Sequence, residues 1–176
     1  MHRALRILPL SAFVLAAAVA STAGAAALSS ADKEFALEAG RGGAAEVEIA
    51  RVAAARATRK EVRDFAQRLV DDHGKANVEL QNLAKQRDVA LTTTLDPLHQ
   101  TVLDQLKTMS GASIDDTFLT AMVKDHTAAS QLFERGQQAT DPDLKAFAQR
   151  TLPTIQQHLE MAKRLAEATA SKGGSR

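Results

Sequence analysis

Cysteine, tryptophan and tyrosine are absent from this chain of 176 residues, and only 3% of its residues are aromatic. Without cysteine there is no disulfide, no thiolate metal site and no motif for covalent haem attachment. Without tryptophan and tyrosine, the usual aromatic platforms for stacking nucleic-acid bases are missing. The stability of the folded chain must therefore come from the packing of apolar side chains.

An excess of charge of one sign is also lacking, since 22 basic residues balance 21 acidic ones and the formal net charge is +1. This balance leaves no electrostatic footprint for nucleic acid and no polybasic surface for anionic lipid. No glycine-rich phosphate loop occurs either, so no nucleotide cofactor is expected. The sequence therefore predicts neither a nucleic-acid-binding protein nor a nucleotide-dependent enzyme.

Residues 1–27 have the layout of a secretory signal peptide. Arg3 and Arg6 form a basic start, an apolar run follows, and the small residues near 25–27 suit cleavage by signal peptidase. An uncleaved anchor is the rival interpretation, because roughly 20 apolar residues can span a bilayer; Pro9 and the small-residue end favour cleavage. We therefore expect an exported, periplasmic protein with formal charge −1 and no integral membrane span after cleavage.

The remaining sequence is rich in strong helix formers and has no strand-like alternation of apolar and polar residues. Its capping signals and prolines predict helices at about 31–57, 61–87, 97–111, 113–139 and 142–171, followed by a disordered tail at 172–176. The predicted caps are Ser29 or Ser30, Thr58 with Glu61, Asp96 before Pro97, Ser113 with Asp116, and Asp141 before Pro142.

The connections between these helices predict the topology. The first two long helices and the last two are joined by tight turns, which require antiparallel hairpins. The middle connection, about 88–113, carries the short helix and is long enough to cross the bundle from end to end. Residues 30–171 are therefore expected to form an all-α, ferritin-like four-helix bundle with a short extra helix in the long crossover.

A Val-x-Asp-His motif occurs twice, as "VDDH" ending at His73 and "VKDH" ending at His126. At spacings of three and four, each long helix has an apolar stripe with one ionisable residue near its centre. These residues are Glu46, His73, His126 and His158. They lie at similar distances from the tight turns, so the four helices should bring them to one height in the core.

One carboxylate and three imidazoles are a ligand set that suits zinc, iron, copper(II) or manganese. A hydrogen-bonded layer that fixes the helix register is the alternative, since buried polar groups need partners. Asp72 and Asp125 stand beside the stripes and are expected to orient an imidazole or to supply a further ligand. The methionines near the stripes are typical core filler, so no haem is expected.

Two further features have simple interpretations. His99, on the short helix, is expected to face solvent. Arg41-Gly42-Gly43 interrupts the first helix about one turn before Glu46; close helix packing is the favoured explanation, and room for a ligand is the other.

The chain resembles a bacterial family known as domain of unknown function 4142. The matching stretches are "DKEFALEAGRGGAAEVEIARVAAARA", "VRDFAQRLVDDHGKANVELQNLA", "FLTAMVKDHTAASQLFE" and "DPDLKAFAQRTLPTIQQHLEMAKRL". The resemblance covers nearly all of the chain after the signal peptide and implies an exported, ferritin-like bundle with Glu46, His73, His126 and His158 as motif positions. It implies no particular reaction.

One departure from the di-iron ferritin pattern matters for the metal. That pattern has Glu-x-x-His on two helices, whereas Val70, Val123 and Ile155 stand three residues before the histidines here. One metal ion or none is therefore expected rather than two. The sequence favours an exported protein that binds one divalent metal in a binding or envelope-stress role; a structural or partner-binding bundle is the alternative. Enzymatic activity is left open, and no motif indicates a protein partner or an oligomeric state.

Overall fold

The computed structural model describes residues 27–173, and all regular structure in that range is helical. The helices are α1 (Ser30–Arg56), α2 (Lys60–Lys85), α3 (Pro97–Thr108), α4 (Ala112–Gly136) and α5 (Pro142–Gly173). The all-α prediction is confirmed, and every helix lies within a few residues of its expected place. Apart from residue 27, the expected signal peptide falls outside the described residues, as does the end of the expected tail at 174–176.

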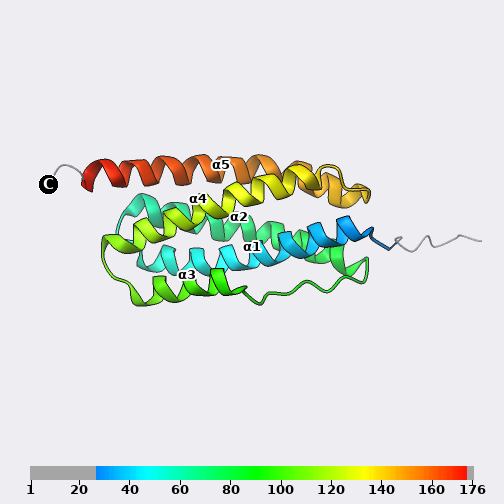
Figure 1. Ribbon diagram of the computed structural model, residues 1–176, viewed down its shortest axis with the longest axis horizontal. Coiled ribbons are helices and arrows are strands. Elements are labelled where there is room, and N and C mark those ends of the chain that lie inside the picture. Colours follow the sequence, from blue (N-terminus) through cyan, green and yellow to red (C-terminus); the bar gives the residue numbers. More distant parts are fainter. Residues whose placement is uncertain (1–26, 174–176) are drawn as a thin grey trace, which may run out of the picture.

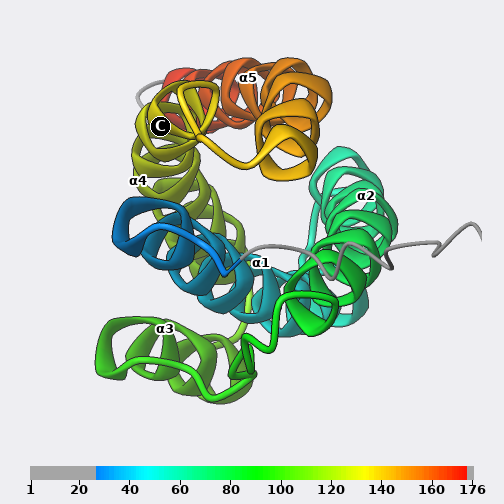
Figure 2. The same ribbon diagram turned by 90° about the vertical axis from the view of Figure 1, so that its right-hand side faces the viewer.

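The four long helices pack side by side around a common core. Both α1 and α5 contact α2 and α4, which closes a ring that is visible end-on in Figure 2. Neighbouring long helices run antiparallel (Figure 1). The connection after α2 returns along the bundle and carries α3, which packs outside the ring against α1 and α4. Among the described residues, no helix has the length and apolar character needed to cross a membrane.

Three helix starts follow the capping signals of the sequence. The Ser29 hydroxyl accepts a hydrogen bond from the Asp32 amide at the start of α1. The Asp96 carboxylate accepts from two amides of α3, whose first residue is Pro97. At the start of α5, Asp141 caps the amides of the first turn in the same way. These side chains satisfy amides that have no partner inside the helix.

Two predicted caps are wrong. Arg59, not Thr58, is the N-cap residue of α2, and the Thr58 hydroxyl donates to the distant Asp115 carboxylate. Gly111 is the N-cap residue of α4, and Ser113 lies inside that helix. Gly111 adopts φ 68°, a left-handed conformation that glycine reaches without steric cost.

Both tight turns are held by an aspartate from a different hairpin. Asp115, near the start of α4, accepts hydrogen bonds from the amide and hydroxyl of Thr58 and from the Arg59 amide. Asp32, in the first turn of α1, does the same for the amide and hydroxyl of Thr140 and for the Asp141 amide. The two hairpins therefore clamp each other's turns in a reciprocal arrangement. We refer to Asp32 and Asp115 as the turn clamps.

The core consists of two apolar clusters with a polar layer between them. One cluster lies toward the 57–59 turn and includes Ile49, Phe65, Leu69, Phe118, Leu119 and Met122. The other lies toward the 137–141 turn and includes Phe35, Leu80, Phe133, Leu144, Phe147 and Ile155. The predicted stripes are buried or half-buried along their whole length. The residues of the central layer separate the two apolar clusters.

Candidate metal centre

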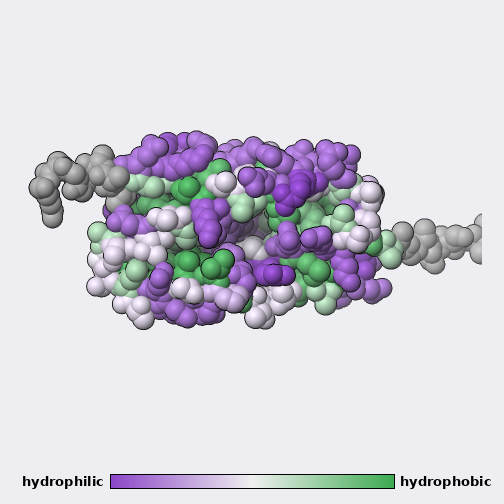
Figure 3. All heavy atoms as spheres, in the orientation of Figure 1, coloured by the Kyte–Doolittle hydropathy of each residue, from purple (hydrophilic) through white to green (hydrophobic). Residues whose placement is uncertain are grey.

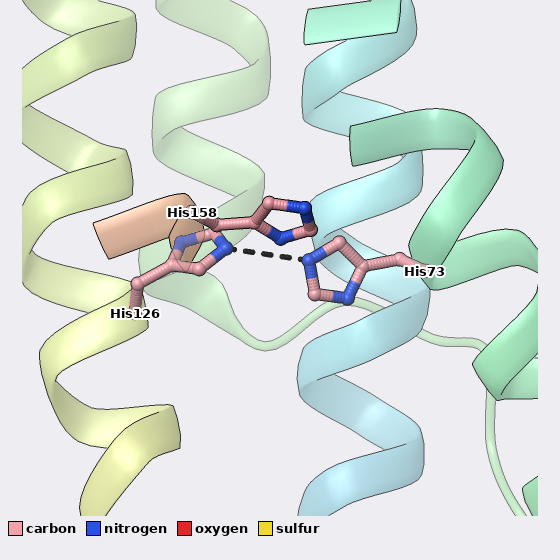
Figure 4. Close-up of side chains that lie close together, drawn as sticks. All are labelled: His73, His126 and His158. Atoms are coloured by element: carbon pink, nitrogen blue, oxygen red, sulfur yellow. Dashed lines mark hydrogen bonds between the residues drawn. The ribbon is translucent and has the colours of Figure 1, made fainter. Parts of the chain in front are cut away.

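Each long helix places one ionisable side chain in the central layer. Glu46 comes from α1, His73 from α2, His126 from α4 and His158 from α5, and all four residues are buried. The three imidazole rings form an even triangle, with every pair of ring centroids 5.4 Å apart (Figure 4). One ring nitrogen from each histidine lies within 4.8 Å of the others. The helical spacing in the sequence predicted this convergence correctly.

Glu46 and His73 form a buried ion pair in the layer. The Glu46 Oε2 atom lies 3.0 Å from Nε2 of His73. Burial alone would raise the pKa of Glu46, but the neighbouring His126 and His73 lower it to about 2. Burial would likewise lower the pKa of His73, yet the Glu46 carboxylate raises it above its usual value. The carboxylate is therefore ionised at neutral pH, and it supplies a negative charge at the centre of the bundle.

His126 is held in one orientation by its own helix. Its Nδ1 atom lies 3.0 Å from the Met122 carbonyl oxygen, which can only accept, so Nδ1 carries the proton in this contact. That tautomer leaves the lone pair on Nε2, which faces His73 Nε2 at 3.3 Å. Oε1 of Glu46 is 3.5 Å from His126 Nδ1, too long for a strong hydrogen bond.

His158 has one nitrogen with a partner and one without. Its Nε2 atom lies 3.0 Å from Oδ2 of Asp72, a carboxylate that is also close to Arg68. Its Nδ1 atom is buried and has no hydrogen-bond partner among the described residues. Burial, followed by the electrostatic influence of the neighbouring His73 and His126 rings, lowers the pKa of His158 to about 4. The imidazole is therefore neutral at pH 7, with the proton on Nε2 toward Asp72 and a free lone pair on Nδ1.

The two aspartates that precede histidines by one residue have different surroundings. Asp72 contacts His158 across the α2–α5 interface and orients its imidazole, which is one of the two roles expected of this aspartate. The carboxylate of Asp125 lies 3.6 Å from Nε2 of His99, outside the layer.

The expectation that His99 faces solvent is wrong. Its side chain is only 20% exposed and contacts both Asp96 and Asp125. The sequence signal for this contact was weak, because Asp125 and His99 meet only through the packing of α3 on α4.

A cavity of about 300 Å³ extends from the surface to the central layer, where Glu46 and His73 line it. Its other walls come from all four long helices and from His99 on α3. The face in Figure 3 is hollowed near its middle, between α1 and α4.

The glycines of α1 have separate roles beside this cavity. A side chain at Gly43 would collide with Asn77, so close packing explains this residue. A Cβ at Gly42 would meet nothing within 4 Å, because it would enter the cavity. Both interpretations of the Arg41-Gly42-Gly43 sequence therefore apply, each to a different residue.

The donor atoms fit a transition metal ion. Two ligand atoms at about 2.1 Å from one ion in tetrahedral geometry are roughly 3.4 Å apart. The His73–His126 nitrogen pair at 3.3 Å and the Glu46–His73 pair at 3.0 Å are close to that spacing. His126 and His158 each give their other nitrogen to a carbonyl or carboxylate, which is the usual second contact of a metal-bound histidine.

Comparisons with known proteins agree with the helical fold. No curated protein matches the chain. A crystal structure of a DUF305 fragment from Deinococcus radiodurans is similar, with a TM-score of 0.73 and 13% sequence identity over 81% of this chain and 99% of that one. At this identity the likeness concerns the fold alone. The family model for the domain of unknown function DUF4142 matches residues 17–165, so the chain belongs to that family.

Proposed function

We propose that the protein binds one divalent transition metal ion in its central layer, through His73, His126, His158 and Glu46. Nitrogen and carboxylate ligands of this kind suit zinc, iron, copper(II) or manganese. His126 would bind through Nε2 and His158 through Nδ1, because their other nitrogens are held by the Met122 carbonyl and by Asp72. Binding would draw His158 toward the other two imidazoles, since the nitrogens now spread over as much as 4.8 Å.

The unpartnered Nδ1 of His158 is the observation that carries this proposal. A buried polar atom without a partner costs about 1–3 kcal/mol. A layer that served only to fix helix register would be expected to satisfy this atom, because unsatisfied buried groups weaken such a layer. A metal ion removes the cost, since the lone pair then has a ligand bond. The hydrogen-bonded layer is the alternative that the experiment must separate from a metal site.

The test is metal content together with thermal stability. Protein purified without chelator or affinity tag should contain about one equivalent of metal. Added Zn²⁺, Cu²⁺, Fe²⁺ or Mn²⁺ at a hundred times the dissociation constant should stabilise it by about 2.7 kcal/mol. His126→Ala should lose that stabilisation, and His99→Ala, a histidine outside the layer, should keep it. If wild-type protein carries no metal and shows no shift with any of the four ions, the layer is a hydrogen-bonded core.

We further propose that the fold is of the ferritin-like type and that the protein is exported. Antiparallel hairpins α1–α2 and α4–α5, joined by a long connection that returns along the bundle, support the first statement. The basic start, apolar run and small residues of 1–27 support the second. The mass of the protein from a periplasmic extract tests export, and cleavage near 25–27 is the expected result. A chain of full-length mass in the membrane fraction would contradict it.

A further inference from the structure

The cavity beside the central layer has the features of a ligand pocket. Its volume, about 300 Å³, is at the lower end of the range for small-molecule sites. Its walls on the side of the 137–141 turn are mainly apolar and include Leu80, Leu132, Phe147 and Ile155. Protein interiors are normally close-packed, so an unfilled space of this size next to buried polar groups indicates a functional role.

The residues at the inner end of the cavity determine which polar group of a ligand can bind there. Glu46 and His73 line the cavity at the layer, and the Glu46 side chain is only 5% exposed. The carboxyl oxygens of Glu46 are hydrogen-bond acceptors, and Oε2 already lies 3.0 Å from Nε2 of His73, so this end of the cavity favours a hydrogen-bond donor over a group that can only accept. A nitrogen head group meets this requirement, and nitrogen is also a ligand for the metals that suit the layer.

Gly42 keeps the cavity open. A side chain there would meet no atom within 4 Å, so neither steric clash nor an unusual backbone angle explains the glycine. Glycine in a helix interior costs about 1 kcal/mol relative to alanine. Gly74 on α2 has equally free space, but it lies outside the cavity. The two positions therefore form a matched pair, since only a substitution at Gly42 fills the pocket.

We propose that this cavity binds a small molecule that has an apolar body and one nitrogen-donor head group, and that it delivers the head group to Glu46 and His73. The apolar walls take up the body of the ligand, and the layer takes up its head. This inference goes beyond metal binding and does not depend on it, because Glu46 alone can accept a hydrogen bond from the head group.

The test uses 4-phenylimidazole as probe and benzoate as its anionic counterpart, with calorimetry on the full chain in metal-free and metal-loaded form. The probe should bind wild type and Gly74→Leu with equal affinity. It should bind Gly42→Leu with at least tenfold lower affinity. Benzoate should bind metal-free wild type at least tenfold more weakly than the probe. Equal affinity of the probe for wild type and Gly42→Leu, or no binding to wild type in either form, would overturn the proposal.

A second measurement does not depend on any variant. Methyl NMR of wild-type protein during the probe titration should show shifts at Leu80, Leu132 and Ile155, which line the cavity. Leu119 and Met122, in the cluster on the other side of the layer, should change little. Shifts spread evenly over both clusters, or none at saturating probe, would contradict a ligand site in this cavity. If the protein binds the probe but no metal, this inference stands and the metal proposal fails. If it binds metal but not the probe, the metal proposal stands and this inference fails.

Discussion

At the scale of single residues, the central layer is asymmetric. Glu46 and His73 contact each other at 3.0 Å, and the His126 imidazole bonds to its own helix through the Met122 carbonyl. His158 alone combines a carboxylate partner on one nitrogen with an unpartnered, buried second nitrogen. The four side chains therefore differ in what their loss would do to the metal-free protein.

Replacement of His158 by leucine should stabilise the metal-free protein by about 1 kcal/mol, because it removes an unsatisfied buried nitrogen and keeps an apolar side chain of similar size. His126→Leu should instead destabilise it, because that change removes the hydrogen bond from the imidazole to the Met122 carbonyl. Urea denaturation of both variants in the presence of a chelator measures the two effects. Equal destabilisation by both would contradict the asymmetry described above.

Removal of the Asp72 carboxylate should weaken metal binding without removing a ligand. The Asp72 carboxylate orients His158 and makes its imidazole more basic, and Asp72→Ala removes this carboxylate. The loss of such a group typically weakens metal affinity 10–100-fold. The measurement is competition with a chromophoric chelator. Asp71→Ala is the matched control, since Asp71 is exposed and does not contact the layer. An affinity that both variants leave unchanged would exclude this role for Asp72.

At the scale of elements, the two turn clamps join the hairpins at opposite ends of the bundle. Each carboxylate accepts three hydrogen bonds from a turn that is distant in sequence. Hydrogen bonds to a charged group contribute more than neutral ones. The geometry of the tight turns thus depends on contacts between hairpins as well as on local sequence.

Asp115→Ala should reduce the free energy of unfolding by about 2–4 kcal/mol, because two part-buried amides and a hydroxyl lose their acceptor. Asp116→Ala, at the exposed neighbouring position, should change it by less than about 0.5 kcal/mol. Chemical denaturation of the two variants gives the comparison. A similar small effect for both would show that the clamp contributes little.

The contact between α3 and α4 should respond to alkaline pH. The nearby Asp125 carboxylate, opposed by burial and assisted by Asp96, raises the pKa of His99 to about 9. Because the folded pKa lies above the unfolded value of about 6.5, the contribution of His99 to stability is complete below pH 6.5 and disappears as pH rises through 9. As the pH rises from 6 to 10, the free energy of unfolding should therefore decrease more in wild type than in His99→Gln. Parallel curves would contradict this assignment.

At the scale of the whole molecule, α3 stands apart from the other helices. It packs on the outside of the ring, and only Leu103 and Leu106 are buried among its residues. These two leucines join the apolar cluster toward the 57–59 turn, whereas the long helices contribute most residues of both clusters. Elements with few buried apolar contacts open at lower free energy than the core.

Native-state hydrogen exchange should consequently show α3 opening before the ring. Amides of α3 are expected to exchange through a local opening, and those at the centres of α1, α2, α4 and α5 only through global unfolding. Metal should slow exchange in the four long helices, which carry the ligands, and should leave the local opening of α3 unchanged. Equal protection in α3 and the long helices would show that the crossover folds as part of the core.

The sequence by itself determined the helices, their order and the four residues of the central layer. Periodicity and capping are local properties, so apolar stripes and residues such as Asp96 and Asp141 could be identified without a structure. The height of Glu46, His73, His126 and His158 followed from the constant rise of a helix and the shortness of the turns. These inferences needed no knowledge of how the helices pack.

Outside the central layer, only the tertiary structure decided which side chains of different elements meet. Thr58 pairs with Asp115 instead of capping α2, His99 pairs with Asp125 instead of facing solvent, and the cavity opens beside Gly42. Each of these features involves residues of different elements, so it depends on crossing angles and on side-chain packing that no local pattern contains. Asp72 and Asp125 occupy the same place in a repeated motif, yet one orients His158 and the other His99. Their helices have different neighbours in the ring, and that difference decides their roles.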